Sequence, residues 1–205
     1  MEKIEKYNDH LLVYTDASKT LNGRASAAFC VPSLKVEHSM RLTNHVTIYA
    51  DELTAILIAL IWIKHNENEP GKSRVDEPVL ICSDSLSSLT SLNTGKSKNR
   101  PNLLTEVREQ ISLIKTEVKF LWVPSHIGVP GNVRVDQLAN DATGKADIEL
   151  NIRLEKQETN ALVETFVKHK WQSGTTPPTT NTTKKSKEKC PTLSNILHIR
   201  GEMKS

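Results

Sequence analysis

The first 146 residues alternate between short apolar runs and longer segments in which apolar residues recur at helical spacing. A short apolar run that ends in polar or turn residues is typical of a buried strand. Apolar residues three and four positions apart predict instead a helix with one buried face. The predicted strands are 11–16, 23–32, 34–42, 78–84 and 118–124, and the predicted helices are 49–65, 85–92, 102–115 and 131–146.

The order of these elements, β-β-β-α-β-α-α-β-α, predicts one mixed α/β domain of about 140 residues. The pattern changes after it, first to a segment that predicts one more amphipathic helix. The last residues are rich in Ser, Thr, Pro and Lys and cannot bury enough apolar area to order themselves. We therefore expect a lead-in at 1–10, the domain at 11–146, an amphipathic helix within 147–172 and a polar basic tail at 173–205.

The net charge of +3 is unevenly distributed along the chain. Up to Lys145 there are 17 basic and 17 acidic residues, whereas the remainder has 10 basic and 7 acidic ones. This distribution excludes a uniformly basic coat for nucleic acid. A polyanionic partner must therefore be met by local patches.

Cysteine spacing and hydropathy indicate the compartment. The three cysteines are far apart and form no C-x-x-C pair, which argues against a disulfide framework and a zinc knuckle. The first ten residues are charged and lack the apolar stretch of a secretory signal. The longest apolar run, 53–63, is well short of the ~20 residues that span a bilayer. We expect an intracellular protein, cytoplasmic or nuclear, that is neither secreted nor bound to a membrane.

Two aspartates, Asp16 and Asp84, end predicted strands. Open α/β sheets bind their ligands at the carboxyl ends of strands. A single aspartate at such a place usually caps a turn or a helix. Two of them on neighbouring parallel strands are brought together, and this favours a functional site.

Two further carboxylates belong to predicted helices. Glu52 shares a helix face with the core positions Ala55 and Ile56, so we expect Asp51 beside it to be the surface group. Asp136 falls within the apolar stripe of the last core helix. Each alone is compatible with a solvated helix residue. Together with the strand aspartates they would repel one another and need a cation. Oxygen ligands select hard ions, so Mg²⁺ or Mn²⁺ is indicated rather than zinc.

Five phrases, in this order and spacing, resemble a type I ribonuclease H. They are YTDAS (14–18), YADELTAI (49–56), ICSDSLSSL (81–89), WVPSHIGVPGN (122–132) and VDQLAN (135–140). The similarity extends over 11–146 and is greatest to the ribonuclease H domains of LINE-type, non-long-terminal-repeat retrotransposon polyproteins. The chain has Ala17 where the family usually has glycine, and Val133 where it often has glutamate. Neither change removes a metal ligand.

The resemblance implies the ribonuclease H-like fold, an α/β architecture. A five-stranded mixed sheet, whose second strand is antiparallel to the rest, is flanked by helices on both faces. It also implies two Mg²⁺ ions, replaceable by Mn²⁺, about 3.5–4 Å apart. Asp16 would bridge the ions, with Glu52 and Asp84 on one and Asp136 on the other. His126, in the loop before the last core helix, would pass a proton or speed product release.

The implied activity is endonucleolytic hydrolysis of the RNA strand of RNA/DNA hybrids, leaving 5′-phosphate and 3′-hydroxyl ends. One alternative is a noncatalytic hybrid-binding protein or structural remnant of a mobile element. Another is a nuclease of the same fold that acts on DNA or structured RNA. Retention of all four carboxylates and His126 favours the enzyme. We expect a monomer, and both a stand-alone chain and the end of a polyprotein with a reverse transcriptase stay open.

Contacts with the hybrid are less visible in the sequence. A hybrid presents 2′-hydroxyls in a wide, shallow minor groove, where a protein distinguishes RNA from DNA without reading sequence. Lys96, Lys98 and Arg100 form a basic patch that suits phosphates, although a solvated loop explains them equally well. The further expected nucleic-acid contacts are Ser18, Ser85 and Asn132.

Overall fold

The structure, a computed structural model, describes residues 6–67, 75, 77–125 and 128–174, the side chains of the last five excepted. The chain divides into two compact units, Met1–Arg153 and Leu154–Ser205. Helix α6 of the second unit spans Lys156–Gly174. Residues 147–155, most of which belong to the first unit, are not helical. None of the described helices combines the length and the hydrophobicity that crossing a bilayer requires.

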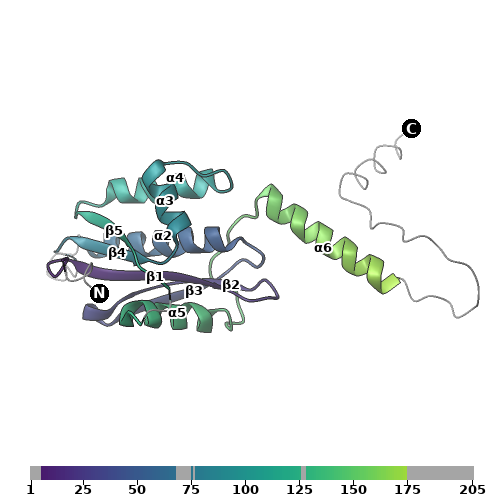
Figure 1. The fold of residues 1–205 in the computed structure, drawn as a ribbon, viewed down its shortest axis with the longest axis horizontal. Helices are drawn as coiled ribbons and strands as arrows, with labels where there is room; N and C mark the ends of the chain where they lie inside the picture. Colours follow the sequence, from purple (N-terminus) through teal and green to yellow (C-terminus); the bar gives the residue numbers. More distant parts are fainter. Residues whose placement is uncertain (1–5, 68–74, 76, 126–127, 175–205) are drawn as a thin grey trace, which may run out of the picture. The chain divides into compact units, whose positions relative to one another are not determined.

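The first unit is built on a five-stranded sheet with the strand order β3-β2-β1-β4-β5 (Figure 1). Strand β2 is antiparallel to β1 and β3, whereas β1, β4 and β5 are parallel. The expected mixed sheet with an antiparallel second strand is thus confirmed. The strands are β1 (Leu11–Lys19), β2 (Ala25–Val31), β3 (Val36–Leu42), β4 (Val79–Ser83) and β5 (Val118–Trp122).

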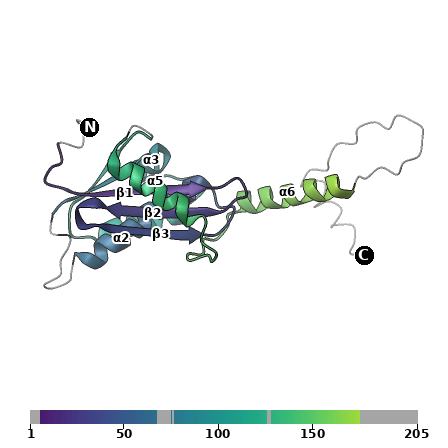
Figure 2. The same ribbon diagram turned by 90° about the horizontal axis from the view of Figure 1, so that it is seen from below.

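Helices cover both faces of this sheet, as the resemblance implies. Among the described helices of the first unit, three lie on one face, and α5 (Pro130–Ala142) lies on the other, where it crosses β1 and β2 (Figures 1 and 2). The hairpin between β2 and β3 turns through a 3₁₀ segment at Pro32–Leu34. The helices are α2 (Ile48–Asn66), α3 (Leu86–Thr94), α4 (Pro101–Leu113) and α5 (Pro130–Ala142).

Helix α2 is the centre of the larger core. Every side chain from Ala50 to Leu60 is buried, because the sheet covers one side of the helix and α3 and α4 cover the other. An all-round apolar sequence is typical of a helix covered in this way. The same coverage buries Asp51 completely, so the expectation that Asp51 is a surface group is wrong.

Helix α5 packs on a second, smaller apolar cluster that includes Tyr14 and Val135. Gly131 lies so close to the Tyr14 ring that a Cβ would come within 2.2 Å of it, so a larger residue there would push α5 away. The buried stripe of α5 runs through Gly131, Asn132, Val135, Ala139 and Ala142. Asp136 therefore falls outside the buried stripe and is exposed, contrary to expectation.

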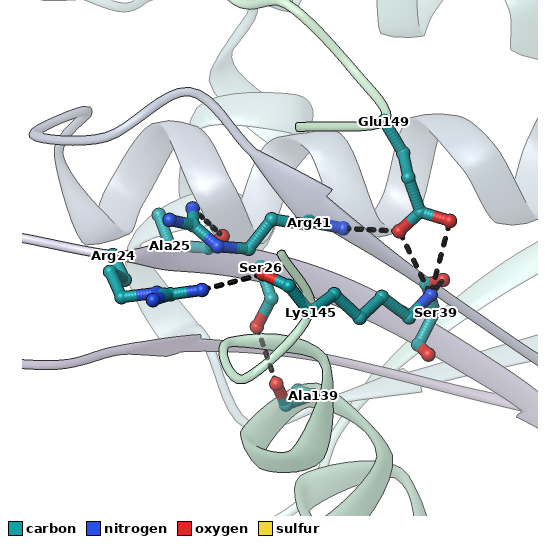
Figure 3. A network of polar contacts seen from close by, with 8 residues as sticks. All are labelled: Arg24, Ala25, Ser26, Ser39, Arg41, Ala139, Lys145 and Glu149. Atoms are coloured by element: carbon teal, nitrogen blue, oxygen red, sulfur yellow. Dashed lines mark hydrogen bonds and ion pairs between the residues drawn. The ribbon is translucent and has the colours of Figure 1, made fainter. Parts of the chain in front are cut away.

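The segment after α5, residues 145–152, returns to strand β3; we call it the strap. A parallel bridge joins Leu42 to Leu150, and both Leu150 and Ile152 pack against the main core. The carboxylate of Glu149 accepts a hydrogen bond from the main-chain N–H of Arg41 at 2.8 Å (Figure 3). The strap thus covers part of the edge strand β3 with both apolar and polar contacts.

Charged groups around the strap are paired or hydrogen-bonded (Figure 3). Lys145 Nζ donates to Glu149 Oε2 at 2.8 Å and to Ser39 O at 2.6 Å. The guanidinium of Arg41, only 3% exposed, donates to Leu42 O at 2.8 Å and to Ala25 O at 3.3 Å. Main-chain carbonyls of its own hairpin thus accept two hydrogen bonds from this buried arginine, whereas its Nε has no partner among the described residues.

Candidate active site

Asp16 and Asp84 lie side by side at the point where the pairing between β1 and β4 ends. Thr15 pairs with Ser83, the last residue of β4, so Asp16 and Asp84 are the next residues on two adjacent parallel strands. Strand β1 itself continues to Lys19, because β2 goes on pairing with it as a hairpin. Asp16 therefore lies inside its strand rather than after it, which corrects the expected strand end.

Helix α2 brings Glu52 from one face of the sheet to these aspartates. One carboxylate oxygen each of Asp16, Glu52 and Asp84 lies within 4.8 Å of the others. Asp136 of α5 is not part of this close group, but it lines the same open cleft of about 360 Å³. The structure thus brings all four sequence-predicted carboxylates to one cleft, with oxygens of three of them within 4.8 Å of one another.

Burial and mutual repulsion dominate the electrostatics of this group. Asp16 is 5% exposed, and its burial, followed by the charge of Asp84, raises its pKa to about 8. A hydrogen bond of 2.9 Å from the main-chain N–H of Ala17 opposes this rise. Burial, and then the charges of Asp16 and Asp84, also raise the pKa of Glu52 well above its usual range.

The group has the properties of a site for a hard divalent cation. Glu52 Oε2 is buried, and among the described residues it has no hydrogen-bond partner. No lysine or arginine is among the described residues that line the cleft, so the negative charges are not balanced there. Carboxylate oxygens at this spacing suit Mg²⁺ or Mn²⁺, which would balance those charges. The donor set therefore fits the metal that the resemblance implies.

The structure adds two residues that the sequence reasoning missed. Ser125 Oγ donates to Asp84 Oδ2 at 2.9 Å, and Trp122 Nε1 donates to Asp84 O at 3.1 Å. Both belong to the phrase WVPSHIGVPGN (122–132), in which the sequence indicated only His126 and Asn132. Their place beside that histidine was the available signal. His126 itself lies outside the described residues.

The expected nucleic-acid contacts divide into several environments. Ser85 lines the carboxylate cleft. Ser18 is half-buried and donates to Asn140 Oδ1 at 3.3 Å. Asn132 is 5% exposed in the first turn of α5, with its Oδ1 buried and unpartnered among the described residues. Of these three positions, only Ser85 lines the carboxylate cleft.

The basic patch is only partly at the surface. Lys96 and Lys98 are exposed and line a groove of about 790 Å³ beside α4, which Arg108 also lines. Arg100, by contrast, is 4% exposed and donates to Arg153 O at 2.6 Å. Its guanidinium is therefore engaged inside the unit, and the expectation that Arg100 grips phosphates is wrong.

Comparison with known proteins agrees with this geometry. The family model described as RNase H matches residues 8–144. That range begins just before β1, ends just after α5 and includes the whole carboxylate cleft. No curated protein matches the chain.

Proposed function

Because the chain belongs to the RNase H family, we propose that it is a metal-dependent endonuclease that hydrolyses the RNA strand of RNA/DNA hybrids. The observation that carries the proposal is the close group of Asp16, Glu52 and Asp84 within the matched range. The products would have 5′-phosphate and 3′-hydroxyl ends. The carboxylate group supports hydrolysis rather than hybrid binding alone, because binding does not need buried like charges.

The four carboxylates are the proposed metal ligands. Asp16 would serve both ions, Glu52 and Asp84 one ion, and the more distant Asp136 the other. Two Mg²⁺ ions, replaceable by Mn²⁺, would supply Lewis acidity at the attacking water and at the leaving 3′ oxygen.

The chain's own residues prepare the site for this chemistry. Sheet and helix burial hold Asp16 and Glu52 in place before substrate arrives, and the Ala17 N–H orients one oxygen of Asp16. His126 is proposed to pass a proton or to help the product leave. The variant His126→Ala should therefore cleave more slowly without losing activity.

Substrate contacts are proposed for Lys96 and Lys98, which suit backbone phosphates, and for Ser85 at the cleft. Tyr49 lines the cleft and its hydroxyl donates to Ser97 Oγ at 3.0 Å, in the loop that carries both lysines. This contact makes the cleft and the basic groove neighbours, as one continuous duplex would require. Ser18 and Asn132 stay proposed contacts of lesser support because of their burial.

The lineage and the organisation of the chain are also proposals. The five sequence phrases support a LINE-type origin, with a monomer that acts inside the cell, alone or together with a reverse transcriptase. We propose that 11–146 carry the chemistry and that 173–205 only add charge. Residues 174–205 contain six basic and two acidic side chains. Truncation after Ser173 should preserve kcat. It should also make the slope of log K against log salt shallower, by less than about 4 units.

The decisive experiment compares labelled RNA/DNA hybrid, double-stranded RNA and double-stranded DNA, each with Mg²⁺, Mn²⁺ or EDTA. We expect cleavage of the hybrid alone, in its RNA strand and only with a divalent ion. Binding of the hybrid without cleavage would instead support the noncatalytic remnant. Cleavage of double-stranded DNA or RNA would identify a related nuclease with another substrate.

A further inference from the structure

Two hydrogen-bond donors from the end of β5 and the loop after it converge on Asp84. The hydroxyl of Ser125 donates to carboxylate atom Oδ2, and the indole N–H of Trp122 donates to the main-chain oxygen. Strand pairing brings them there, because Trp122 is the register partner of Ser83. One donor thus acts on the side chain of Asp84 and the other on its backbone.

Asp84 needs such support more than the other carboxylates of the close group. Asp16 and Glu52 are 5% and 8% exposed and are confined by the surrounding core, whereas Asp84 is only half-buried. In the part of the chain that the structure describes, the carboxylate of Asp84 accepts one hydrogen bond, from Ser125. Repulsion from the two buried carboxylates would otherwise favour a rotamer that points away from them.

The backbone of Asp84 is held at the same place. Its main-chain oxygen accepts hydrogen bonds from Leu86 N at 3.0 Å and from the Trp122 indole at 3.1 Å. The preceding carbonyl, Ser83 O, accepts from Val123 N at 3.0 Å. The turn from β4 into α3 is therefore tied to the end of β5 at two successive residues.

We propose that Ser125 and Trp122 are positioning residues that hold Asp84 in its metal-binding orientation. This inference rests on the proposed function, since it assumes that Asp84 is a ligand. One hydrogen bond to Oδ2 leaves the other lone pairs of the carboxylate free for a cation. Partners of this kind orient metal ligands, and removing one typically costs about 10–100-fold in metal affinity or activity.

The test measures Mn²⁺ affinity of the substrate-free protein by calorimetric titration. Ser125→Ala should weaken binding about tenfold, at the lower end of that range because Ser125 is exposed. Ser125→Thr keeps the hydroxyl and should retain the wild-type affinity. Trp122→Phe keeps an aromatic ring but loses the N–H, and should weaken binding about threefold. The exposure of Ser125 also means that its alanine variant should fold like the wild type.

Kinetics on the hybrid separate positioning from substrate contact. In Ser125→Ala, kcat should fall at limiting Mn²⁺ and recover as Mn²⁺ is raised, while KM for the hybrid stays unchanged. A raised KM with wild-type Mn²⁺ affinity would instead mean that Ser125 touches substrate, and would overturn the inference.

The variant Asp84→Asn separates failure of the proposed metal site from failure of the proposed positioning role. If the wild type binds Mn²⁺ no better than Asp84→Asn does, the proposed metal site fails and the inference fails with it. If Asp84→Asn loses binding but Ser125→Ala binds as the wild type does, only the positioning role is overturned. Loss in both Asp84→Asn and Ser125→Ala, with retention in Ser125→Thr, supports it.

Discussion

Two polar clusters of the first unit differ in whether their charged side chains have partners within the chain. Around the strap, Glu149 is paired with Lys145, and the buried Arg41 donates to main-chain carbonyls (Figure 3). In the cleft, Asp16, Glu52 and Asp84 are close together, with no cation among the described lining residues. The charged groups of the first cluster thus have partners within the chain, whereas the carboxylates of the second are not balanced by the described residues that line the cleft.

The difference separates stabilising polar groups from functional ones. A buried polar group stabilises a fold when its partners are supplied by the same fold. A cluster of buried like charges costs stability and is tolerated where a ligand balances it. Substitutions in the cleft should therefore lower the rate of cleavage and raise the free energy of unfolding. Substitutions around the strap should lower only the free energy of unfolding.

The largest expected effect is on cleavage. Asp16→Asn and Asp84→Asn should each lower the rate of hybrid cleavage by more than about 100-fold, because a direct ligand matters more than its supporting partners. In EDTA and at a pH above about 8, where Asp16 is ionised, both variants should unfold at a higher denaturant concentration than the wild type, because repulsion is relieved. Rapid cleavage by either variant would refute the site.

The control for this comparison is Asp141→Asn, since Asp141 is an exposed acid on the same helix as Asp136. It should leave both cleavage and stability close to wild type. Asp51 does not suit this purpose, because it is fully buried.

The cleft should also make the metal-free protein sensitive to pH. Because the pKa of Asp16 is raised from 3.8 to about 8, the folded state holds this proton more tightly than the unfolded state. The stabilisation of the folded state by the protonated Asp16 is complete below the pKa of this group in the unfolded chain, 3.8. It is lost as the pH rises through about 8. Urea unfolding in EDTA should become easier over this range, and less so in Asp16→Asn. If the free energy of unfolding depended on pH equally in the wild type and in Asp16→Asn, the raised pKa would not belong to Asp16.

Beside the strap, Arg41→Met should destabilise the domain by about 2–3 kcal/mol, because the carbonyls of Ala25 and Leu42 lose a hydrogen-bond donor. Urea unfolding measures this free energy. Once folded, the variant should cleave hybrid at the wild-type rate, because Arg41 does not line the cleft. A specific loss of kcat in the folded variant would show that the two clusters are coupled.

The smallest effect is expected for Glu149→Gln. The pair with Lys145 is more than a third exposed on both sides, so its loss should cost about 0.5 kcal/mol at low salt and less at high salt. Denaturation at two ionic strengths checks this. A larger cost that is independent of salt would indicate that the hydrogen bond from Arg41 N, rather than the ion pair, holds the strap.

Local pattern alone predicted much of this protein. Short apolar runs and helical spacing predicted the described β-strands and α-helices of the first unit, because a buried face imposes its spacing on the sequence. They did not predict the 3₁₀ segment Pro32–Leu34. The sequence also placed Asp16 and Asp84 each at the end of an apolar run. In the structure these two runs are neighbouring parallel strands. The apolar stripes of two predicted helices indicated Glu52 and Asp136, and the resemblance to a family implied their role as metal ligands.

Tertiary structure decided which polar groups are free to act. Asp51 is buried because other helices cover the outer side of α2, and Arg100 is engaged by the carbonyl of Arg153, far away in the sequence. The donors to Asp84 likewise come from another strand and the loop after it. The sequence determined the elements and the candidate ligands, because these depend on neighbours along the chain. Burial, partners and orientation depend on neighbours in space, and only the fold determines those.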